Sequence, residues 1–506
     1  MAAPMDSMFR LLVGKRKLNF IGLRSDLKRW LATVTNYQTT VDDSLTELKT
    51  FRKHPGIMRP KNVKLPDALL QNLNQYLADK PVKQLKPRAT ALGNYLWSRQ
   101  QPLEEAGLRA KAQEYARIQG VEDLDEEMLY SHDLPKDRKK KVSSVMNTLR
   151  RHVYHWQPIT YDEVTVCAYT LARIAPNYAT IYRVLQEIQK RLPDFSPQNL
   201  LDFGSGIGTA SWAAHTLWGD AIKEFYCVDT SRPMHDVAEA LMREQEAENE
   251  ENNSIIKGVY FRHFLPMSLQ KKYDLTISAY SLLELPSSAD RLNTLRTLWR
   301  KTDQFLVLVE CGTNEGYKTL MEARDFILND LQREENRNET GRGVARGVDR
   351  GELGLAEDST NLVGHVFAPC QHDQSCPRTI DNSGTPCNFE QDFHDFNKRG
   401  HSSELTRERF CYLVLRKGPR TSVDNTDHWP RIVRPVLPRA RHVICRLCCS
   451  NGQLEETIIT RAKHGRELYR CARYSAWGDL LPISRPQDSD VPGRQTDSEG
   501  EHSGID

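Results

Sequence analysis

The chain contains the stretch Leu201-Asp202-Phe203-Gly204-Ser205-Gly206-Ile207-Gly208. It belongs to a short apolar run and opens an amphipathic segment, so the glycines lie where a predicted strand passes into a predicted helix. Glycine lets the backbone turn sharply at such a point, and the free amides at the start of a helix favour polar or anionic groups. Asp229 ends the next apolar run, where a carboxylate can accept hydrogen bonds from ribose hydroxyls. The stretch therefore predicts a nucleotide-type pocket beside a parallel sheet.

Short apolar runs alternate with amphipathic segments on the C-terminal side of this stretch, which is the pattern of parallel strands joined by helices. The predicted strands are Leu200–Phe203, Glu224–Val228, Gly258–Arg262, Tyr273–Ser278 and Phe305–Glu310, with a later one at Phe410–Arg416. The pattern is similar to that of the S-adenosylmethionine-dependent methyltransferase superfamily. The resemblance implies an α/β, Rossmann-like class I methyltransferase fold. It also implies that S-adenosylmethionine would be bound by Asp202, Gly204, Gly206, Gly208 and Asp229.

The segment after the fourth strand reads Ser278-Ala279-Tyr280-Ser281. Amino methyltransferases place an Asp or Asn followed by Pro-Pro and an aromatic residue there, and enzymes that methylate pyrimidine carbons need a nucleophilic cysteine. This chain has no obvious base or nucleophile at the position, and we assign no catalytic residue. An active enzyme and a cofactor-shaped domain kept as a scaffold both remain open, because fold does not imply function.

The full chain has 506 residues, of which 39% are hydrophobic and 27% charged. This length argues for more than one folding unit, and the composition excludes a disordered or fibrous protein. No run approaches the roughly 20 apolar residues of a membrane-spanning helix, so we expect no membrane span. The net charge is +3, but six carboxylates against two arginines follow Ser484. The folded part is therefore mildly basic, which permits an RNA partner without requiring one.

The N-terminal part of the chain is basic and then helical. Residues 1–35 carry seven basic side chains against two acidic ones with apolar residues interleaved, which is typical of a mitochondrial presequence or of a disordered basic end. From about 64 to 195 the apolar spacing predicts helices, and Pro176 is expected to divide the last of them. The basic run from Lys136 to Lys141 is either a solvated face or a phosphate-binding one.

Three cysteines, Cys370, Cys376 and Cys387, lie in a segment rich in Pro and Gly. Such a segment lacks the apolar neighbours that would bury thiols, so we interpret the three as metal ligands. A fourth donor would come from a nearby histidine or from Cys411, Cys445, Cys448, Cys449 or Cys471. Zinc is the usual metal of four-cysteine sites, whereas the uneven spacing and the proline after Cys376 favour an iron–sulfur cluster. The cysteine spacing alone does not distinguish a zinc site from an iron–sulfur cluster.

Several stretches together resemble one family. They are Ala172-Arg173-Ile174-Ala175-Pro176-Asn177-Tyr178-Ala179, the glycine stretch, Val309-Glu310-Cys311-Gly312-Thr313-Asn314-Glu315-Gly316, Phe367-Ala368-Pro369-Cys370, Tyr412-Leu413-Val414-Leu415-Arg416, Tyr469-Arg470-Cys471-Ala472-Arg473 and Trp477-Gly478-Asp479-Leu480-Leu481-Pro482. Between about 60 and 484 the chain is similar to the methyltransferase-like family of mitochondrial ribosomal small-subunit assembly proteins. The resemblance implies a factor of the mitochondrial matrix that supports mitochondrial translation. Its implied partners are small-subunit rRNA and ribosomal proteins, and we expect a monomer away from the ribosome.

The same resemblance implies a 4Fe-4S cluster. Carried over residue by residue, its ligands would be Cys370, Cys376, Cys387 and Cys448, the last because it matches the family's hairpin cysteine. The cluster would then join the cysteine segment to a small C-terminal module. The other functions left open are an active S-adenosylmethionine-dependent rRNA methyltransferase and a zinc-stabilised RNA-binding module.

A basic segment before the C-terminal hairpin then suggests an RNA-facing surface, because arginine pairs with phosphate and an aromatic ring can stack on a base. The alternative is that its arginines only protect a sheet edge from aggregation. The residues expected on this surface are Trp429, Arg431, Arg434, Arg439 and Arg441.

The predicted organisation combines these features. Asn-Gly at 451–452 predicts a tight turn between two strands of the C-terminal module, His442–Cys449 and Leu454–Arg461. The parts are a presequence (1–35), an N-terminal helical region (36–195), the Rossmann domain (196–332 and 405–420), a flexible insertion (333–358), a cysteine-rich cluster loop (359–404), a basic, metal-stapled β module (421–484) and a disordered acidic tail (485–506).

Overall fold

The structure of the chain is a computed structural model that describes residues 40–41, 51–120, 135–152, 156–244, 254–266, 268–331, 333, 363–381, 384–398, 405–420 and 428–484. The expected presequence, the acidic tail and all of the insertion after Arg333 lie outside these residues. Those three assignments stay predictions.

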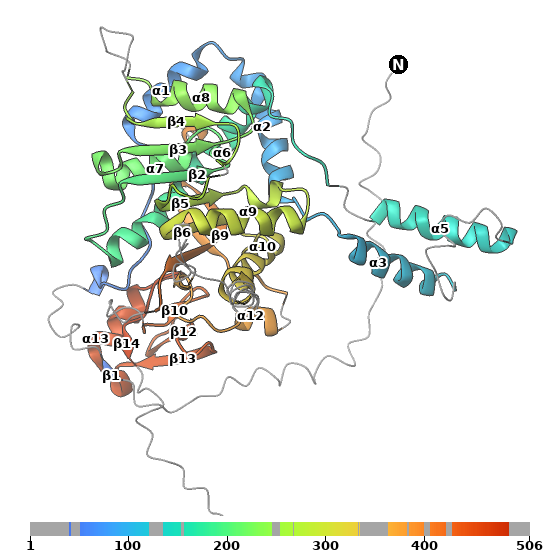
Figure 1. Cartoon of the computed structure of the whole chain (residues 1–506). Helices are drawn as coiled ribbons and strands as arrows, with labels where there is room; N and C mark the ends of the chain where they lie inside the picture. Colours follow the sequence, from blue (N-terminus) through green and yellow to red (C-terminus); the bar gives the residue numbers. More distant parts are fainter. Residues whose placement is uncertain are drawn as a thin grey trace, which may run out of the picture. The chain divides into compact units, whose positions relative to one another are not determined.

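The described part of the chain contains a mixed sheet of eight strands (Figure 1). Its order is β4-β3-β2-β5-β6-β9-β7, and β8 pairs with the first half of β9. The bounds are β2 (Asn199–Phe203), β3 (Glu224–Val228), β4 (Val259–Arg262), β5 (Tyr273–Ala279), β6 (Thr302–Cys311), β7 (Gly364–Ala368), β8 (Phe389–His394) and β9 (Leu405–Lys417). Strands β2 to β6 are parallel, and β9 runs antiparallel to β6, β7 and β8. The predicted α/β class with a mostly parallel sheet is confirmed.

Helices cover both faces of this sheet because successive side chains of a strand point to opposite faces. The faces carry two hydrophobic clusters, one with Leu200, Ile277 and Val307 and the other with Leu201 and Leu308. Helices α1, α6, α7 and α8 contribute to the first cluster, and α9 and α10 to the second. The bounds are α1 (Asp67–Ala78), α2 (Val82–Trp97), α6 (Glu163–Arg191), α7 (Thr209–Trp218), α8 (Arg232–Met242), α9 (Ser288–Lys301) and α10 (Asn314–Asp325), with a π-helical turn at Phe326–Asp330.

Two of the N-terminal helices, α1 and α6, share the hydrophobic core of the sheet. Leu69 and Leu73 of α1 and Ile174 and Ile181 of α6 belong to the same cluster as the sheet residues. The expected boundary between 195 and 196 therefore does not separate two cores, which corrects the N-terminal helical region as an independent domain.

Helix α6 continues through Pro176, whereas the sequence predicts two helices there. A proline inside a helix removes one backbone hydrogen bond and costs about 3 kcal/mol. Most residues of α6 are buried, and the Thr180 hydroxyl donates to the carbonyl groups of Pro176 and Asn177 at 3.0 Å. Packing on nearly all sides stabilises the helix more than the proline destabilises it.

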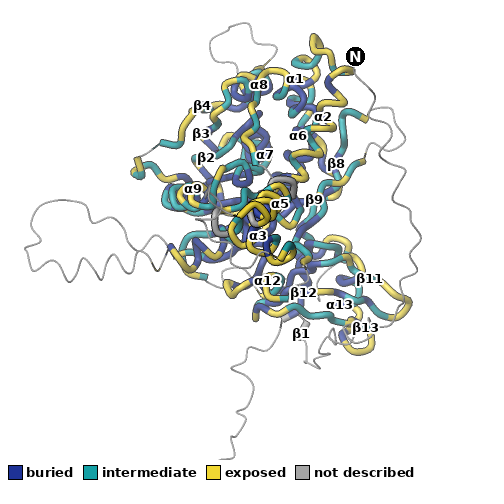
Figure 2. Tube along the Cα trace, turned by 90° about the vertical axis from the view of Figure 1, so that its right-hand side faces the viewer, coloured by how far each residue is buried: buried dark blue, intermediate teal, exposed yellow. Residues whose placement is uncertain are grey.

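Helices α3 (Glu105–Ile118) and α5 (Lys136–His152) pack against each other and form a separate small core. Ala112 and Ala116 of α3 meet Val142 and Val145 of α5. Much of the rest of both helices is exposed (Figure 2). Both helices are among those that the apolar spacing predicts.

The C-terminal module contains a small antiparallel sheet and the helical segment α13, which is kinked at Gly465. The predicted hairpin is confirmed, with Gly452 at φ 73° in its turn. Helix α13 packs on the hairpin through Leu468 and Ala472 and has no counterpart in the sequence prediction. The elements are β10 (Arg431–Ile432), β11 (Leu437–Pro438), β12 (His442–Cys448), β13 (Leu454–Thr460) and α13 (Arg461–Tyr474), and a further antiparallel pair joins β1 (Thr40–Val41) to β14 (Ile483–Ser484).

The cysteine-rich segment is more regular than the expected loop. Strands β7 and β8 lie within the predicted loop 359–404 and extend the main sheet by pairing with β9. Between them lies the short helix α12 (Pro377–Ile380). The boundary of the Rossmann domain at 405 is therefore corrected, because this segment adds two strands to its sheet.

Candidate functional site

A pocket opens at the carboxyl ends of β2, β3 and β5, where a ligand of a doubly wound sheet is expected. Gly204, Gly206 and Asp229 line it, as predicted for cofactor binding. The remaining walls are mostly aromatic and aliphatic with one further carboxylate, and include Tyr161, Tyr169, Phe203, His263, Tyr280 and Glu284. The glycine loop and the strand-end carboxylate therefore meet in one pocket, although they are 23 positions apart along the chain.

Asp229 organises the glycine loop through its two carboxylate oxygens. The amide of Gly206 donates to Oδ2 and the amide of Ser231 donates to Oδ1, both at 2.9 Å. A carboxylate has about four acceptor positions, so both oxygens keep capacity for further donors such as ribose hydroxyls. Gly204 has φ 69°, and a Cβ there would meet the Ser281 hydroxyl at 2.0 Å. Its lack of a side chain is what lets the loop pass this close.

Asp202 and Gly208 do not line the pocket. Asp202 is buried, accepts a 3.5 Å hydrogen bond from Ser211, and has its pKa raised to about 7 by burial and by the charge of Asp229. Gly208 lies against α8, where a Cβ would meet Met242 at 2.6 Å. Of the five predicted cofactor residues, three line the pocket. The other two, Asp202 and Gly208, support the glycine loop without lining the pocket.

Tyr280 is the one described residue other than glycine with positive φ, at 58°. Such backbone strain gathers at functional sites, and Tyr280 lines the pocket. Its hydroxyl lies 2.8 Å from that of Thr180, and the Arg173 guanidinium lies over its ring. In the sequence, the stretch around Tyr280 drew attention only because it lacks a catalytic base or nucleophile. Its place in the pocket wall was not predicted.

A second site forms where four separate segments meet. Cys370, Cys376, Cys387 and Cys448 line one small cavity, together with Arg431 and apolar neighbours. The four thiols follow β7, open α12, precede β8 and end β12, respectively. Cys370, Cys376 and Cys448 are buried and Cys387 is half-buried. The structure thus brings together all four cysteines that the resemblance implied.

The thiols interact with each other and with neighbouring side chains. A hydrogen bond from Cys448 lowers the pKa of Cys370 to about 7, with help from nearby arginines, although burial opposes the shift. Burial raises the pKa of Cys387. The Tyr317 hydroxyl donates to the sulfur of Cys376 at 3.2 Å, and Nε2 of His372 lies 3.4 Å from the sulfur of Cys448. Of the four thiols, only Cys370 is shifted toward the thiolate that binds metal, because donors and positive charge stabilise the charged form. The pKa values of Cys376 and Cys448 are raised, like that of Cys387.

Three arginines from separate segments of the chain hold the backbone that carries Cys370. Arg431 donates to the carbonyl of Pro369 at 2.9 Å, and Arg420 donates to that of Val366 at 2.7 Å. Arg324 of α10 donates to the carbonyls of His372 and Gln374. Sequence reasoning missed Arg324 and Arg420, because nothing in their local patterns marks residues that act across the fold.

Arg431 and Trp429 are inside the protein, which corrects their expected place on an RNA-facing surface. Trp429 is 2% exposed and Arg431 is not exposed at all. Arg431 forms an ion pair with Glu187 of α6 and also donates to the carbonyl of Gly478 at 2.8 Å. A buried cation needs a partner, and Arg431 has one in Glu187. Its contacts therefore join β10 to α6 and to the cysteine segment inside the protein.

The other predicted surface residues have different positions. Arg439 and Arg441 are exposed at the start of the hairpin, and Arg434 is half-buried. Helix α13 adds exposed basic side chains at Arg461, Lys463 and Arg466. The candidate RNA surface therefore shifts from Trp429 and Arg431 toward the hairpin and α13.

The four thiols line one cavity, but their arrangement in this structure is not that of a formed metal site. Among the described residues, no three His, Cys, Asp or Glu side chains are grouped so that they could hold a metal ion. No helix in the described ranges is long and apolar enough to cross a membrane.

Gln371, next to Cys370, is buried and its side-chain amide has no hydrogen-bond partner in this part of the structure.

The sheet and the glycine-loop pocket define a doubly wound α/β protein with a nucleotide-type pocket and a separate cysteine-lined site. Residues 163–482 match the family described as mitochondrial small ribosomal subunit Rsm22. The chain belongs to this family, which confirms the expected localisation in the mitochondrial matrix.

Two relatives illustrate the range of similarity. The chain is 38% identical to the human mitochondrial ribosome assembly protein METTL17 over 464 residues, which are 90% of this chain and 92% of the relative. It is 24% identical to the mitochondrial ribosome assembly protein RSM22 of Saccharomyces cerevisiae over 63% of this chain and 67% of that one. Among solved structures, magnesium protoporphyrin IX methyltransferase from Synechocystis with bound SAH matches 55% of this chain and 95% of that chain at 14% identity and a TM-score of 0.25.

Proposed function

We propose that this protein assists assembly of the mitochondrial small ribosomal subunit by binding its rRNA, and that a 4Fe-4S cluster on Cys370, Cys376, Cys387 and Cys448 maintains its active shape. The observation that carries the proposal is the convergence of these four thiols on one cavity. The family assignment and the names of the relatives support the assembly role. We further propose that the protein thereby supports mitochondrial translation.

The chain's own residues prepare this site. Arg324, Arg420 and Arg431 hold the main chain around Cys370, and their positive charges offset those of thiolates. When bound, the cluster would supply iron–thiolate bonds that link the main sheet to the end of β12. The arginine network and the four thiols would then fix the C-terminal module against the sheet.

The basic surface of the C-terminal module provides the RNA contact in this proposal. Arg439 and Arg441 lie next to the hairpin, and the exposed basic residues of α13 follow it in sequence. Arginine guanidinium groups bind phosphate through two parallel hydrogen bonds. If the cluster fixes this module, RNA affinity depends on the cysteines although none of them touches RNA.

The test compares Cys370→Ser/Cys376→Ser with Cys445→Ser. Cys445 is also buried, but it belongs to the core of the C-terminal module and does not line the cavity. Each variant is expressed in cells that lack the wild-type protein, and its co-sedimentation with the small subunit is measured. We expect the double variant to lose iron and subunit association and Cys445→Ser to keep both. Undiminished association of an iron-free double variant would contradict the proposal.

A second candidate function is binding of S-adenosylmethionine with rRNA methylation. The pocket formed by Gly204, Gly206 and Asp229 favours cofactor binding, although no residue in it is assigned as a catalytic base. Gly206→Val together with Asp229→Ala should abolish cofactor binding measured by calorimetry, since Gly206 has φ 50° and Asp229 fixes its amide. Normal subunit maturation with this variant would leave the pocket without a role in assembly.

A further inference from the structure

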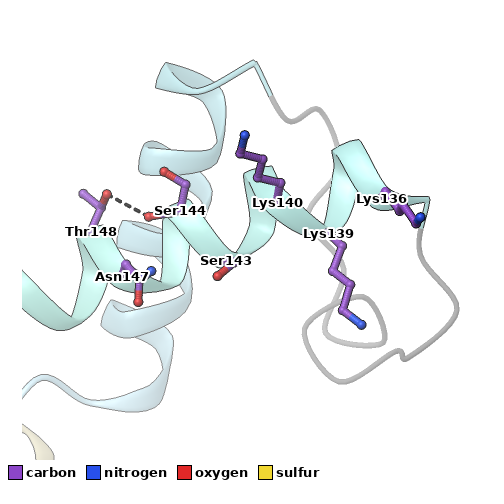
Figure 3. A pocket seen from close by; sticks show the side chains of 7 residues that line it. All are labelled: Lys136, Lys139, Lys140, Ser143, Ser144, Asn147 and Thr148. Carbon is purple, nitrogen blue, oxygen red and sulfur yellow. Dashed lines mark hydrogen bonds between the residues drawn. The ribbon is translucent and has the colours of Figure 1, made fainter.

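Seven side chains of helix α5 line one shallow pocket on its exposed side (Figure 3). Three are lysines, and the other four carry hydroxyl or amide groups. We call this surface the lysine face; it consists of Lys136, Lys139, Lys140, Ser143, Ser144, Asn147 and Thr148. It lies outside both sites described above.

The spacing of these residues places them along one side of the helix. Steps of three and four residues bring side chains to the same face, and the 12 steps from Lys136 to Thr148 span about 18 Å at roughly 1.5 Å per residue. Val142 and Val145 point the other way and pack against α3. The three lysines are exposed, so helix packing does not account for them.

The chemistry of the lysine face is that of a phosphate-backbone contact. Its seven side chains include no carboxylate and no aromatic ring, although the exposed Asp137 lies at its flank. Lysine, serine, threonine and asparagine are common donors to the phosphates and sugars of nucleic acids. Stacking on unpaired bases needs aromatic rings or arginine, which this face lacks. A double-stranded backbone therefore fits it better than a single strand.

We propose that the lysine face of α5 binds the sugar–phosphate backbone of an RNA duplex, as a second contact besides the C-terminal basic surface. The inference rests on the proposed function, because it assumes that the protein binds rRNA. An anionic membrane is the competing partner for a basic amphipathic helix, but the apolar side of α5 is covered by α3. The lysine face can therefore attract a membrane only through charge.

The experiment uses the full chain and a fluorescein-labelled RNA duplex of about 20 base pairs, which exceeds the roughly 16 base pairs that a double-stranded RNA-binding domain spans. The variant Lys136→Glu/Lys139→Glu is compared with Lys83→Glu/Lys86→Glu, which changes two exposed lysines of α2 at the same spacing. Glutamate is favourable in the first turn of α5, so the helix should persist. We expect the α5 variant to bind the duplex about tenfold more weakly, and its affinity to depend less steeply on salt, by the equivalent of about two phosphate contacts. The control should change little in both respects.

The outcomes separate this inference from the proposed function. If the wild-type chain binds no RNA, both fail. If the wild-type chain binds the duplex and the α5 variant binds it equally well, the inference alone fails. It also fails alone if the α5 variant and the α2 control lose the same amount of affinity. Loss of binding to cardiolipin-containing vesicles without loss of RNA binding would also overturn it. Should the glutamate variant unfold by circular dichroism, Lys136→Gln/Lys139→Gln replaces it and is expected to weaken binding about threefold to tenfold.

Discussion

The glycine-loop pocket and the cysteine cavity are built in opposite ways. The pocket is open, and its glycine loop comes from one contiguous stretch fixed by a carboxylate at the end of the neighbouring strand. The cavity is small and buried, and it receives its thiols from four segments that span residues 370 to 448. The pocket is formed by the sheet, α6 and the segment before α6, whereas the cavity also needs the C-terminal module to dock correctly. Binding in the cavity therefore reports on the docking of the C-terminal module, and binding in the pocket does not.

The largest expected effect concerns the fourth ligand of the cavity. Cys448 and Cys449 are adjacent and both buried, but only Cys448 lines the cavity. Cys448→Ser should therefore remove nearly all bound iron, because a four-thiolate cluster loses one of its ligands. Cys449→Ser should retain it. Iron content per chain after anaerobic purification is the measurement, and equal loss in both variants would refute the ligand assignment.

The next effect concerns the ion pair that joins the cavity to α6. Arg431→Met leaves Glu187 buried with only its weaker partners, which should reduce the free energy of unfolding by about 3–5 kcal/mol. The control Arg407→Met breaks exposed pairs with Glu390 and Asp392 and should cost less than about 1 kcal/mol. Denaturant titration measures both, and similar losses would contradict a special role for Arg431.

The same pair predicts a sensitivity to acid. Burial alone would raise the pKa of Glu187, but Arg431 outweighs it and holds that pKa below its usual 4.5. A depressed carboxylate pKa contributes stability above the unfolded value, and this contribution is lost as the pH falls through the folded value. In the Arg431→Met variant, the free energy of unfolding should therefore fall less steeply with decreasing pH below about pH 4.5 than in the wild type.

A smaller effect tests the frame of the glycine-loop pocket. Gly208 and Gly219 flank α7, and both have positive φ. A Cβ at Gly208 would meet Met242 at 2.6 Å, whereas at Gly219 nothing lies within 4 Å. Gly208→Ala should thus cost about 1–3 kcal/mol more than Gly219→Ala in thermal or denaturant unfolding. Equal costs would mean that backbone strain alone matters at Gly208.

The last prediction is a pH dependence of stability at Glu310, which is buried beside the 3-10 turn at Leu282–Glu284. Glu310 is buried and accepts the amides of Leu282 and Leu283, and burial raises its pKa to about 8. A raised carboxylate pKa makes the folded state bind the proton more tightly, so stability falls as the pH rises from about 4.5 to 8, by at most about 1.4 kcal/mol per pH unit. Glu310→Gln keeps an acceptor and should remove this slope. An unchanged slope would exclude Glu310 as its source.

Local patterns in the sequence predict the pocket well and the cavity only in part. The five parallel strands and the glycine loop follow from apolar runs and turn residues within a few positions of each other. The pairing of β7 and β8 with β9, the continuity of α6 through Pro176 and the burial of Arg431 depend on residues far away in sequence. Arg431 resembled a surface arginine because its partner Glu187 lies 244 positions earlier. The four cysteines were brought together by family resemblance, since spacing alone left the fourth ligand open.

The central claim is that the four thiols of the cavity hold one iron–sulfur cluster. The most direct test is iron, zinc and acid-labile sulfide analysis of the full chain purified without air, together with its visible absorption spectrum. We expect a brown protein with about four iron and four sulfide per chain. A colourless protein with about one zinc per chain and no sulfide would contradict it.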